Sequence, residues 1–150
     1  MSELRKIPLK GWRVDVNTGT VDVPVWTQVK GIRSPSLVND FTMQDTTTLD
    51  SDGAGSDGST LYKWRLTIEG LEGYTGSFVR DPGQVFLKSK GRLIGPDSEV
   101  QLRFYRTDPD EGYEGTAEVK WQGTGGPITD YTPFRIECHG QGALADYTPA

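Results

Sequence analysis

Apolar and polar residues alternate along much of this chain, and the alternation predicts β-strands. Four segments each carry one apolar face and one polar or charged face. Their apolar positions are Tyr62, Trp64, Leu66 and Ile68; Val100, Leu102 and Phe104; Tyr113, Ala117, Val119 and Trp121; Phe134, Ile136 and Cys138. The positions between them are Lys63, Arg65, Thr67 and Glu69; Gln101, Arg103 and Tyr105; Glu114, Thr116, Glu118 and Lys120; Arg135, Glu137 and His139. One buried side per strand is typical of an antiparallel sheet.

The remaining pattern adds further strands and a single helix. Residues 11–16 and 20–25 flank the sequence Asn-Thr-Gly at 17–19, which predicts a turn between two strands, and residues 25–32 continue as strand. Asp81 is a suitable helix N-cap, and Pro82 suits the first helical position. Gly91 is placed to end this helix in the left-handed conformation. We therefore expect a mainly β chain with one helix of about ten residues.

A long acidic stretch lies between the segments 26–33 and 64–71. It contains no Lys or Arg between Arg33 and Lys63. Its acidic residues are Asp40, Asp45, Asp50, Asp52 and Asp57. Hairpin loops usually take about 2–5 residues, so we expect residues 34–60 to form an extended acidic loop rather than a turn. Such a loop is either ordered by a partner or mobile, and it is therefore a candidate interface.

Composition limits the function classes. A chain of 150 residues with 34% hydrophobic residues is a single domain, residues 1–150, with a thin core. A net charge of −5 argues against a general nucleic-acid binder, because binding to phosphates needs clustered Lys and Arg. One cysteine and one histidine allow neither an intrachain disulfide nor a site of several histidines. No apolar run approaches the roughly 20 residues that span a bilayer, so we expect no membrane partner and an intracellular protein at synthesis.

The candidate chemical motifs favour neither catalysis nor cofactor binding. Asp45, Asp50 and Asp52 superficially suggest a calcium loop, but their spacing does not fit and no Glu stands at the twelfth position. Alternation places Cys138 and His139 on opposite faces of one strand, where they cannot act as nucleophile and base. We expect no enzyme activity, no metal site and no cofactor.

The order of these segments resembles that of the major tail tube proteins of long, non-contractile (siphovirus-type) phage tails. The matching motifs are Ile32-Arg-Ser-Pro35, Asp50-Ser-Asp52, Arg103-Phe104-Tyr105, Gly112-Tyr-Glu-Gly115 and the glycines Gly140 and Gly142. The resemblance covers nearly the whole chain, and it lies in the order and spacing of the motifs rather than in any one of them. Tube proteins of contractile tails and of needle-like secretion systems share the same general fold, so the resemblance separates these relatives poorly.

The resemblance implies an antiparallel β-sandwich or small barrel with one short flanking α-helix and a long acidic loop arm, that is, a tail-tube fold. It implies homohexameric rings that stack into a hollow tube, which conducts phage DNA without binding it specifically. Its partners would be further copies of itself, the tape measure protein, and the tail-tip and tail-terminator proteins. The protein would be located in the virion tail, and in the host cytoplasm during assembly.

The same resemblance assigns candidate roles to particular residues. The inter-subunit or inter-ring loop would carry Asp40, Asp45, Asp50, Asp52 and Asp57. The candidate lumen-facing residues are Arg65, Glu69, Glu114, Glu118 and Lys120. Alternation separates two faces of each strand but does not say which one meets the channel.

Two alternatives come from other classes of protein. A carbohydrate-binding β-sandwich would use tryptophans as stacking platforms, and the chain has Trp12, Trp26, Trp64 and Trp121. Trp64 and Trp121 fall on apolar strand faces, however, where core packing is the simpler explanation. A small hydrolase is the other alternative, and the sequence offers it no nucleophile–base pair.

Overall fold

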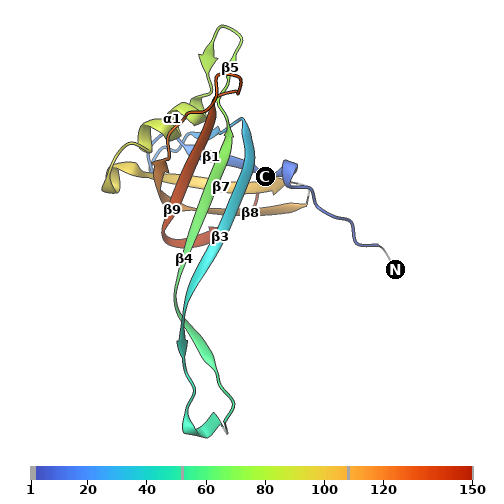
Figure 1. Ribbon diagram of the computed structural model, residues 1–150, viewed down its shortest axis with the longest axis vertical. Helices are drawn as coiled ribbons and strands as arrows, with labels where there is room; N and C mark the ends of the chain where they lie inside the picture. Colours follow the sequence, from blue (N-terminus) through green and yellow to red (C-terminus); the bar gives the residue numbers. More distant parts are fainter. Residues whose placement is uncertain (1–2, 52, 108, 150) are drawn as a thin grey trace.

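The computed structural model describes residues 3–51, 53–107 and 109–149 (Figure 1). Its strands are β1 (Arg13–Asn17), β2 (Trp26–Gln28), β3 (Ile32–Asp45), β4 (Asp57–Leu71), β5 (Tyr74–Thr75), β6 (Val79–Arg80), β7 (Glu99–Thr107), β8 (Asp110–Trp121) and β9 (Pro133–Asp146). Its helices are α1 (Pro82–Lys90) and the short 3₁₀ segments η1 (Leu9–Gly11), η2 (Leu49–Ser51) and η3 (Gly95–Ser98). The predicted mainly β fold with one short α-helix is confirmed for the described residues.

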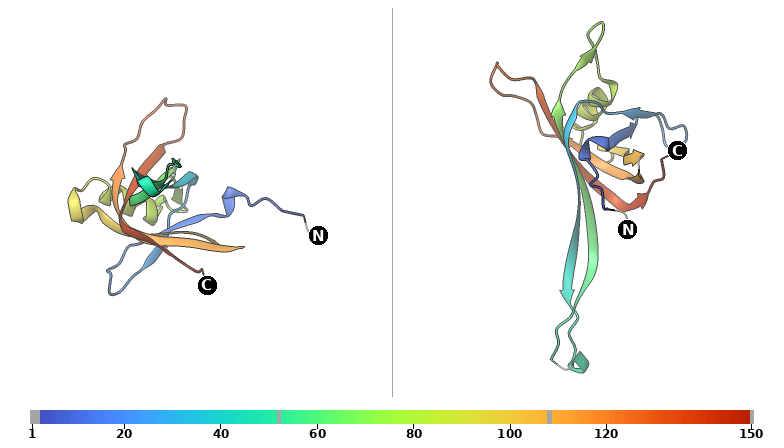
Figure 2. Two further views of the ribbon diagram at one scale, coloured as in Figure 1. Left: turned by 90° about the horizontal axis from the view of Figure 1, so that it is seen from below. Right: turned by 90° about the vertical axis from the view of Figure 1, so that its right-hand side faces the viewer.

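One antiparallel sheet of seven strands forms the body, in the order β2-β1-β7-β8-β9-β4-β3. Figure 1 shows that β7 and β8 run across the view, whereas β9, β4 and β3 run along the long axis. The sheet therefore bends sharply and encloses its core as a partly open barrel. A small second sheet, β5-β6, forms a separate hairpin that projects at one end (Figures 1 and 2).

The core fills the concave side of the bent sheet. Its members are Val14, Val16, Val29, Trp64, Leu66, Ile68, Leu87, Val100, Leu102, Phe104, Ala117, Val119, Phe134, Ile136 and Cys138. Trp64 lies where the sheet bends, and its indole packs directly over Gly115 of β8 and Gly140 of β9. A Cβ on Gly140 would lie 2.3 Å from the indole Cε2, so this position accepts only glycine without rearrangement.

The helix begins and ends at the predicted residues, but its end is of a different kind. The Asp81 carboxylate accepts a hydrogen bond from the Gln84 backbone N–H, at 3.1 Å, as an N-cap does. Gly91 has a right-handed backbone (φ −68°), so the predicted left-handed ending is wrong. Glycine is needed at this position because the backbone of β8 passes close to it: a Cβ on residue 91 would lie 2.5 Å from the Trp121 backbone nitrogen. No helix among the described residues is long and apolar enough to cross a membrane.

The first hairpin differs from the prediction, because residues 20–25 form a loop and β2 is confined to Trp26–Gln28. The side chain of Asn17 organises this loop. Its Oδ1 accepts from the backbone N–H of Gly19 and of Val25, each at 2.9 Å, and its Nδ2 donates to the Thr20 carbonyl at 3.1 Å. A single carboxamide thus satisfies backbone groups that a second strand would otherwise have paired.

Candidate functional site

Strands β3 and β4 extend well beyond the body as a two-stranded arm (Figures 1 and 2). Their pairing continues outward to Asp45 opposite Asp57, so the prediction of an extended loop over residues 34–60 is wrong for all but residues 46–56. The connecting segment is closed by its own hydrogen bonds, including Thr46 N–H to the Ser56 carbonyl at 2.9 Å. Alternation failed to reveal these strands because no core lies beneath the arm to require an apolar face.

The acidic residues predicted to form an interface lie on this arm. Asp40 is exposed on β3, opposite Lys63 in the ladder, and Asp50 lies in η2 at the tip. Asp45 and Asp57 are direct cross-strand partners. The remaining member of the predicted set, Asp52, lies outside the described residues.

Asp45 is held in its charged form by the tip itself. Its carboxylate accepts a hydrogen bond from the Thr47 backbone N–H at 2.8 Å. Hydrogen bonds from the Thr47 side chain and backbone hold the pKa of Asp45 below its ordinary value. Asp45 therefore stays ionised next to Asp57, which faces the same side of the ladder.

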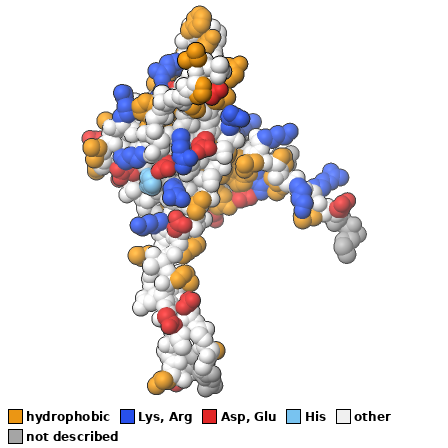
Figure 3. All heavy atoms as spheres, viewed as in Figure 1, with side chains coloured by type: hydrophobic (Ala, Val, Ile, Leu, Met, Phe, Trp, Pro, Cys, Tyr) orange, Lys and Arg blue, Asp and Glu red, His pale blue; other side chains and the backbone are white. Residues whose placement is uncertain are grey.

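The arm also exposes apolar side chains, which sequence reasoning missed. These are Phe41, Met43, Leu49 and Leu61, each more than half exposed, together with Tyr62. The rings of Phe41 and Tyr62 stack with their centroids 5.8 Å apart. In Figure 3 the outer part of the arm shows acidic and hydrophobic side chains but no basic ones. Apolar side chains gathered on a slender projection indicate a surface that another molecule covers.

The candidate lumen residues come together on one face of the sheet. Between β4 and β9, Arg65 lies opposite His139 and Glu69 lies opposite Arg135. Between β8 and β9, Glu118 lies opposite the same His139. Lys120 stands opposite Glu137, and Glu114 opposite Arg103. Direct partners in an antiparallel ladder share a face, so these side chains line the convex, solvent side of the sheet.

Charges on this polar face are largely paired with one another. Arg135 contacts both Glu69 and Glu137, the latter at 3.4 Å. Lys120 pairs with Glu118 at 2.8 Å, and this hydrogen bond lowers the pKa of Glu118. Farther along the face Arg103 pairs with Glu114 at 3.0 Å. The resulting surface is hydrophilic and of mixed charge, with no large region of one sign (Figure 3).

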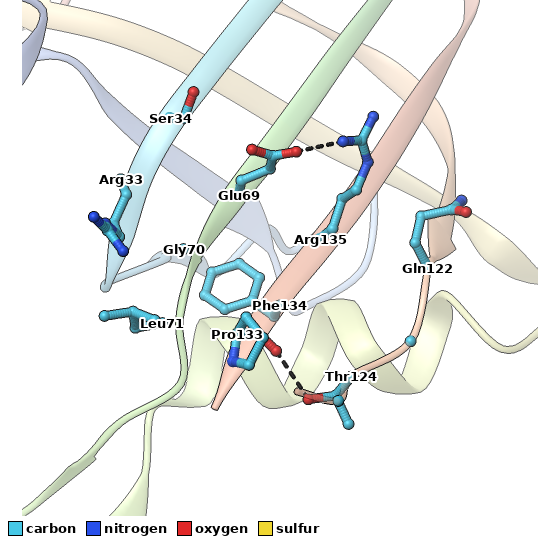
Figure 4. A pocket seen from close by; sticks show the side chains of 12 residues that line it. Arg33, Ser34, Glu69, Gly70, Leu71, Gln122, Thr124, Pro133, Phe134 and Arg135 are labelled. Atoms are coloured by element: carbon cyan, nitrogen blue, oxygen red, sulfur yellow. Dashed lines mark hydrogen bonds and ion pairs between the residues drawn. The ribbon is translucent and has the colours of Figure 1, made fainter. Parts of the chain in front are cut away.

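A groove of about 730 Å³ lies at the end of β3, β4 and β9 that is opposite to the arm. It is lined by Arg33, Ser34, Glu69, Gly70, Leu71, Gln122, Gly123, Thr124, Gly125, Pro133, Phe134 and Arg135. Figure 4 shows Arg33 on one side of the groove, with Gln122 and Thr124 on the other. The ladder is interrupted between Ile32 and Ser34, so Arg33 is the extra residue of a bulge. Bulges of this kind change the direction of a side chain.

Solved structures of low sequence identity have the same architecture. The SPP1 tail tube aligns with a TM-score of 0.71 at 10% identity, covering 96% of this chain and 80% of that chain. The tail of an empty GTA particle, with C6 symmetry, gives a TM-score of 0.64 at 12% identity and covers 95% and 99%. A chain of the anti-feeding prophage baseplate, 6-fold symmetrised, gives 0.62 at 10% identity and covers 98% and 97%. This chain has a tail-tube fold.

No protein-family model and no curated protein matches the sequence. The solved structures thus confirm the predicted resemblance to tail tube proteins at the level of the fold. The match to the SPP1 tail tube covers 96% of this chain.

Within the tail-tube fold the tryptophans are engaged in packing. Trp64 is buried and donates its indole N–H to the Gly142 carbonyl at 3.1 Å. Trp12 stacks on Phe104 at 4.5 Å between centroids, and the Arg103 guanidinium lies 3.7 Å from the Trp26 ring centroid. These contacts cover ring faces that a sugar would need, so the geometry does not favour the carbohydrate-binding alternative.

Cys138 and His139 lie on opposite faces of β9, as predicted. Cys138 is fully buried, and burial raises the pKa of its thiol to about 12. His139 is exposed on the polar face, with its Nε2 3.4 Å from a Glu137 carboxylate oxygen. Among the described residues no three His, Cys, Asp or Glu side chains are grouped so that they could hold a metal ion.

Proposed function

We propose that this protein is the structural subunit of a phage-type tail tube, in which homohexameric rings stack into a hollow conduit for DNA. The observation that carries the proposal is the agreement of fold with the SPP1 tail tube over 96% of the chain. Two further matches come from the tail of a GTA particle with C6 symmetry and from a 6-fold symmetrised baseplate. These symmetries support a six-membered ring.

The open edges of the sheet favour lateral assembly. β3 and β2 are the edge strands, and β3 is 14 residues long. A long unpaired strand edge is a template for uncontrolled association unless a neighbour covers it. Closing a ring of identical subunits covers such edges, so the proposed ring accounts for a strand that would be a liability in a monomer.

The polar face is proposed to line the channel. It carries Arg65, Glu69, Glu114, Glu118 and Lys120 among paired neighbours. Arg103, Lys120 and Arg135 on this hydrated face are already paired with carboxylates, although Arg65 is in no ion pair of the described residues. The face therefore offers few free cations to phosphates, and the net charge of −5 repels them. DNA would pass along such a surface without adhering to it.

The arm is proposed to make the contacts between subunits or rings. Its exposed apolar residues and its acidic residues Asp40, Asp45, Asp50 and Asp57 are the surface involved. The predicted set also includes Asp52. The wider partners would be a tape measure protein and tail-tip and tail-terminator proteins, and the protein would be located in the virion tail.

Electron microscopy of the concentrated, negatively stained protein tests this function, with light-scattering mass in dilute solution beside it. Stacked hollow rings with sixfold symmetry are the expected result. Since tube subunits of this kind can need a nucleus, the same sample is also examined with tail-tip complexes added. A protein that stays monomeric in both samples contradicts the proposal. In that case quenching of tryptophan fluorescence by sugars tests the carbohydrate-binding alternative.

A further inference from the structure

The arm carries an electrostatic conflict that the subunit does not resolve. Asp45 and Asp57 are direct cross-strand partners, and like charges placed opposite each other destabilise a ladder. Asp45 is kept ionised by its hydrogen bonds to Thr47, so the pair does not escape by sharing a proton. Neither carboxylate belongs to an ion pair among the described residues. A cation from outside the subunit would relieve the repulsion.

The groove at the far end of the same two strands offers such a cation. Arg33 is exposed and takes part in no ion pair of the described residues, whereas Arg135 across the groove is already paired with Glu69. Leu71 and Pro133 add apolar lining beside it (Figure 4). The arm tip presents a matching apolar residue, because the side chain of Leu49 is fully exposed.

We propose that the groove receives the arm tip of a second copy of this chain. Arg33 of one copy would face Asp45 and Asp57 of the next, and Leu49 would lie against Leu71 and Pro133. This inference rests on the proposed function and deepens it, because it names the surface that the arm meets.

The positions of the two surfaces determine the kind of assembly. The arm tip lies at one end of β3 and β4 (Figure 2, right), and the residues that line the groove lie at the other end of the same strands. A contact between unlike surfaces repeats from copy to copy and forms an open array unless the rotation between copies closes a ring. Surfaces at opposite ends of two long strands favour the open array. From Trp64, the buried residue of β4 nearest the arm, the strand runs on to Asp57, about 20 Å at a strand rise of roughly 3.3 Å per residue, so the arm can reach into the next subunit. Contact in this direction adds copies along the tube axis.

Charge reversal tests the contact in the full-length chain. Arg33→Glu places a third carboxylate beside the acidic pair, and we expect stacked rings to fall about tenfold or more in electron micrographs. Asp57→Arg alone leaves one carboxylate and one guanidinium at the acidic pair, so the attraction to Arg33 is lost and stacking should fall as well. In the double variant the glutamate introduced in the groove meets the arginine introduced on the arm while Asp45 is unchanged, so stacking should recover in part. Arg92→Glu reverses an exposed arginine outside the groove and is the matched control.

Cross-linking gives a readout that does not depend on tubes. Arg33→Cys and Asp57→Cys chains are mixed and treated with a short bifunctional maleimide, while the buried Cys138 stays unreactive. Mixed dimers in excess over either self-dimer support the contact. Tubes without such mixed dimers, or tubes unaffected by Arg33→Glu, overturn this inference and leave the proposed function standing. Mixed dimers without any rings would instead contradict the proposed function and keep the contact.

Discussion

At the scale of single residues, the fold depends on a few positions where size or burial leaves no alternative. Gly115 and Gly140 allow the Trp64 indole to lie flat against the bend of the sheet. Cys138, on the core side of β9 beside this region, is completely buried. A thiol in such surroundings stays protonated, since ionising it there would leave an unpaired charge in the core.

Stability should therefore fall at alkaline pH, and part of the fall should belong to Cys138. Its pKa is raised from 9.0 in the unfolded chain to about 12 in the folded protein. The stabilisation is complete below pH 9 and is lost as pH rises toward 12, by up to about 1.4 kcal/mol per pH unit. Urea unfolding at pH 8, 9, 10 and 11 measures this slope.

The variant Cys138→Ala isolates the contribution of the thiol. It should be less stable at every pH because a buried side chain is made smaller, yet its stability should depend less on pH between 9 and 10. Tyr105 and Tyr113 also have raised pKa values, through burial and through hydrogen bonds to carboxylates, and their effect begins above pH 10. Equal slopes for both proteins between pH 9 and 10 would show that Cys138 is accessible to water.

At the scale of elements, helix and arm are held in different ways. The helix is fixed by buried polar contacts: Gln84 donates to the Lys30 and Leu71 carbonyls, at 2.5 and 3.1 Å, and Leu87 is fully buried. The arm is held by its own ladder and, at its base, by the Tyr62 hydroxyl, which accepts a hydrogen bond from the Leu144 N–H of β9 at 3.0 Å. Changes to the helix should thus alter folding, whereas changes to the arm should alter assembly.

Removing the helix cap is expected to destabilise the subunit. In Asp81→Ala the Gln84 and Lys30 backbone N–H groups lose the acceptor that they now share, at 3.1 and 3.2 Å. We expect a loss of about 1–2 kcal/mol in the free energy of unfolding, measured with chemical denaturant. Asp81→Asn keeps an acceptor oxygen and should recover most of the loss. An unchanged stability in Asp81→Ala would mean that the cap does not hold the helix.

Shortening the arm is expected to leave a folded subunit that no longer assembles. Residues 44–58 are replaced by Asn-Gly, which joins the ladder partners Met43 and Ser59 through a two-residue turn. Circular dichroism and the unfolding midpoint should stay close to those of the unaltered protein, since the removed residues touch no core side chain. Electron microscopy should show no stacked rings. Normal tubes from this variant would refute the proposed role of the arm.

At the scale of the whole molecule, charge is distributed so that the two ends and the face differ. The arm is acidic, and the opposite end has Arg33, which is in no ion pair with the part of the chain that the structure describes. Ion pairs balance most of the charge on the polar face between them. If that face lines the channel, a change of charge there acts on DNA in the tube rather than on folding.

The variant Glu118→Lys tests the assignment of the lumen. It removes an anion and adds a cation on the polar face, which in a sixfold ring adds a belt of positive charge to the channel. Ejection of DNA from particles built with this subunit should slow several-fold at low salt and recover at high salt. Asp22→Lys, in the exposed loop 18–25, makes the same change of charge elsewhere and should leave ejection unaltered. Equal rates of DNA ejection for the two variants would show that the polar face does not line the lumen.

The sequence by itself determined β1, β7, β8, β9 and the inner part of β4, the helix and its cap, and the separation of the apolar core face from the polar face. These follow from local rules, because a buried face imposes alternation and a helix start needs an acceptor such as Asp81. Only the tertiary structure decided that residues 34–45 and 57–60 are strands. It also decided that residues 20–25 form a loop, which the Asn17 side chain holds by hydrogen bonds to its backbone. It alone placed the groove around Arg33. These features depend on which strands pair and how the sheet bends, and residues distant in sequence leave no periodic signal of such contacts.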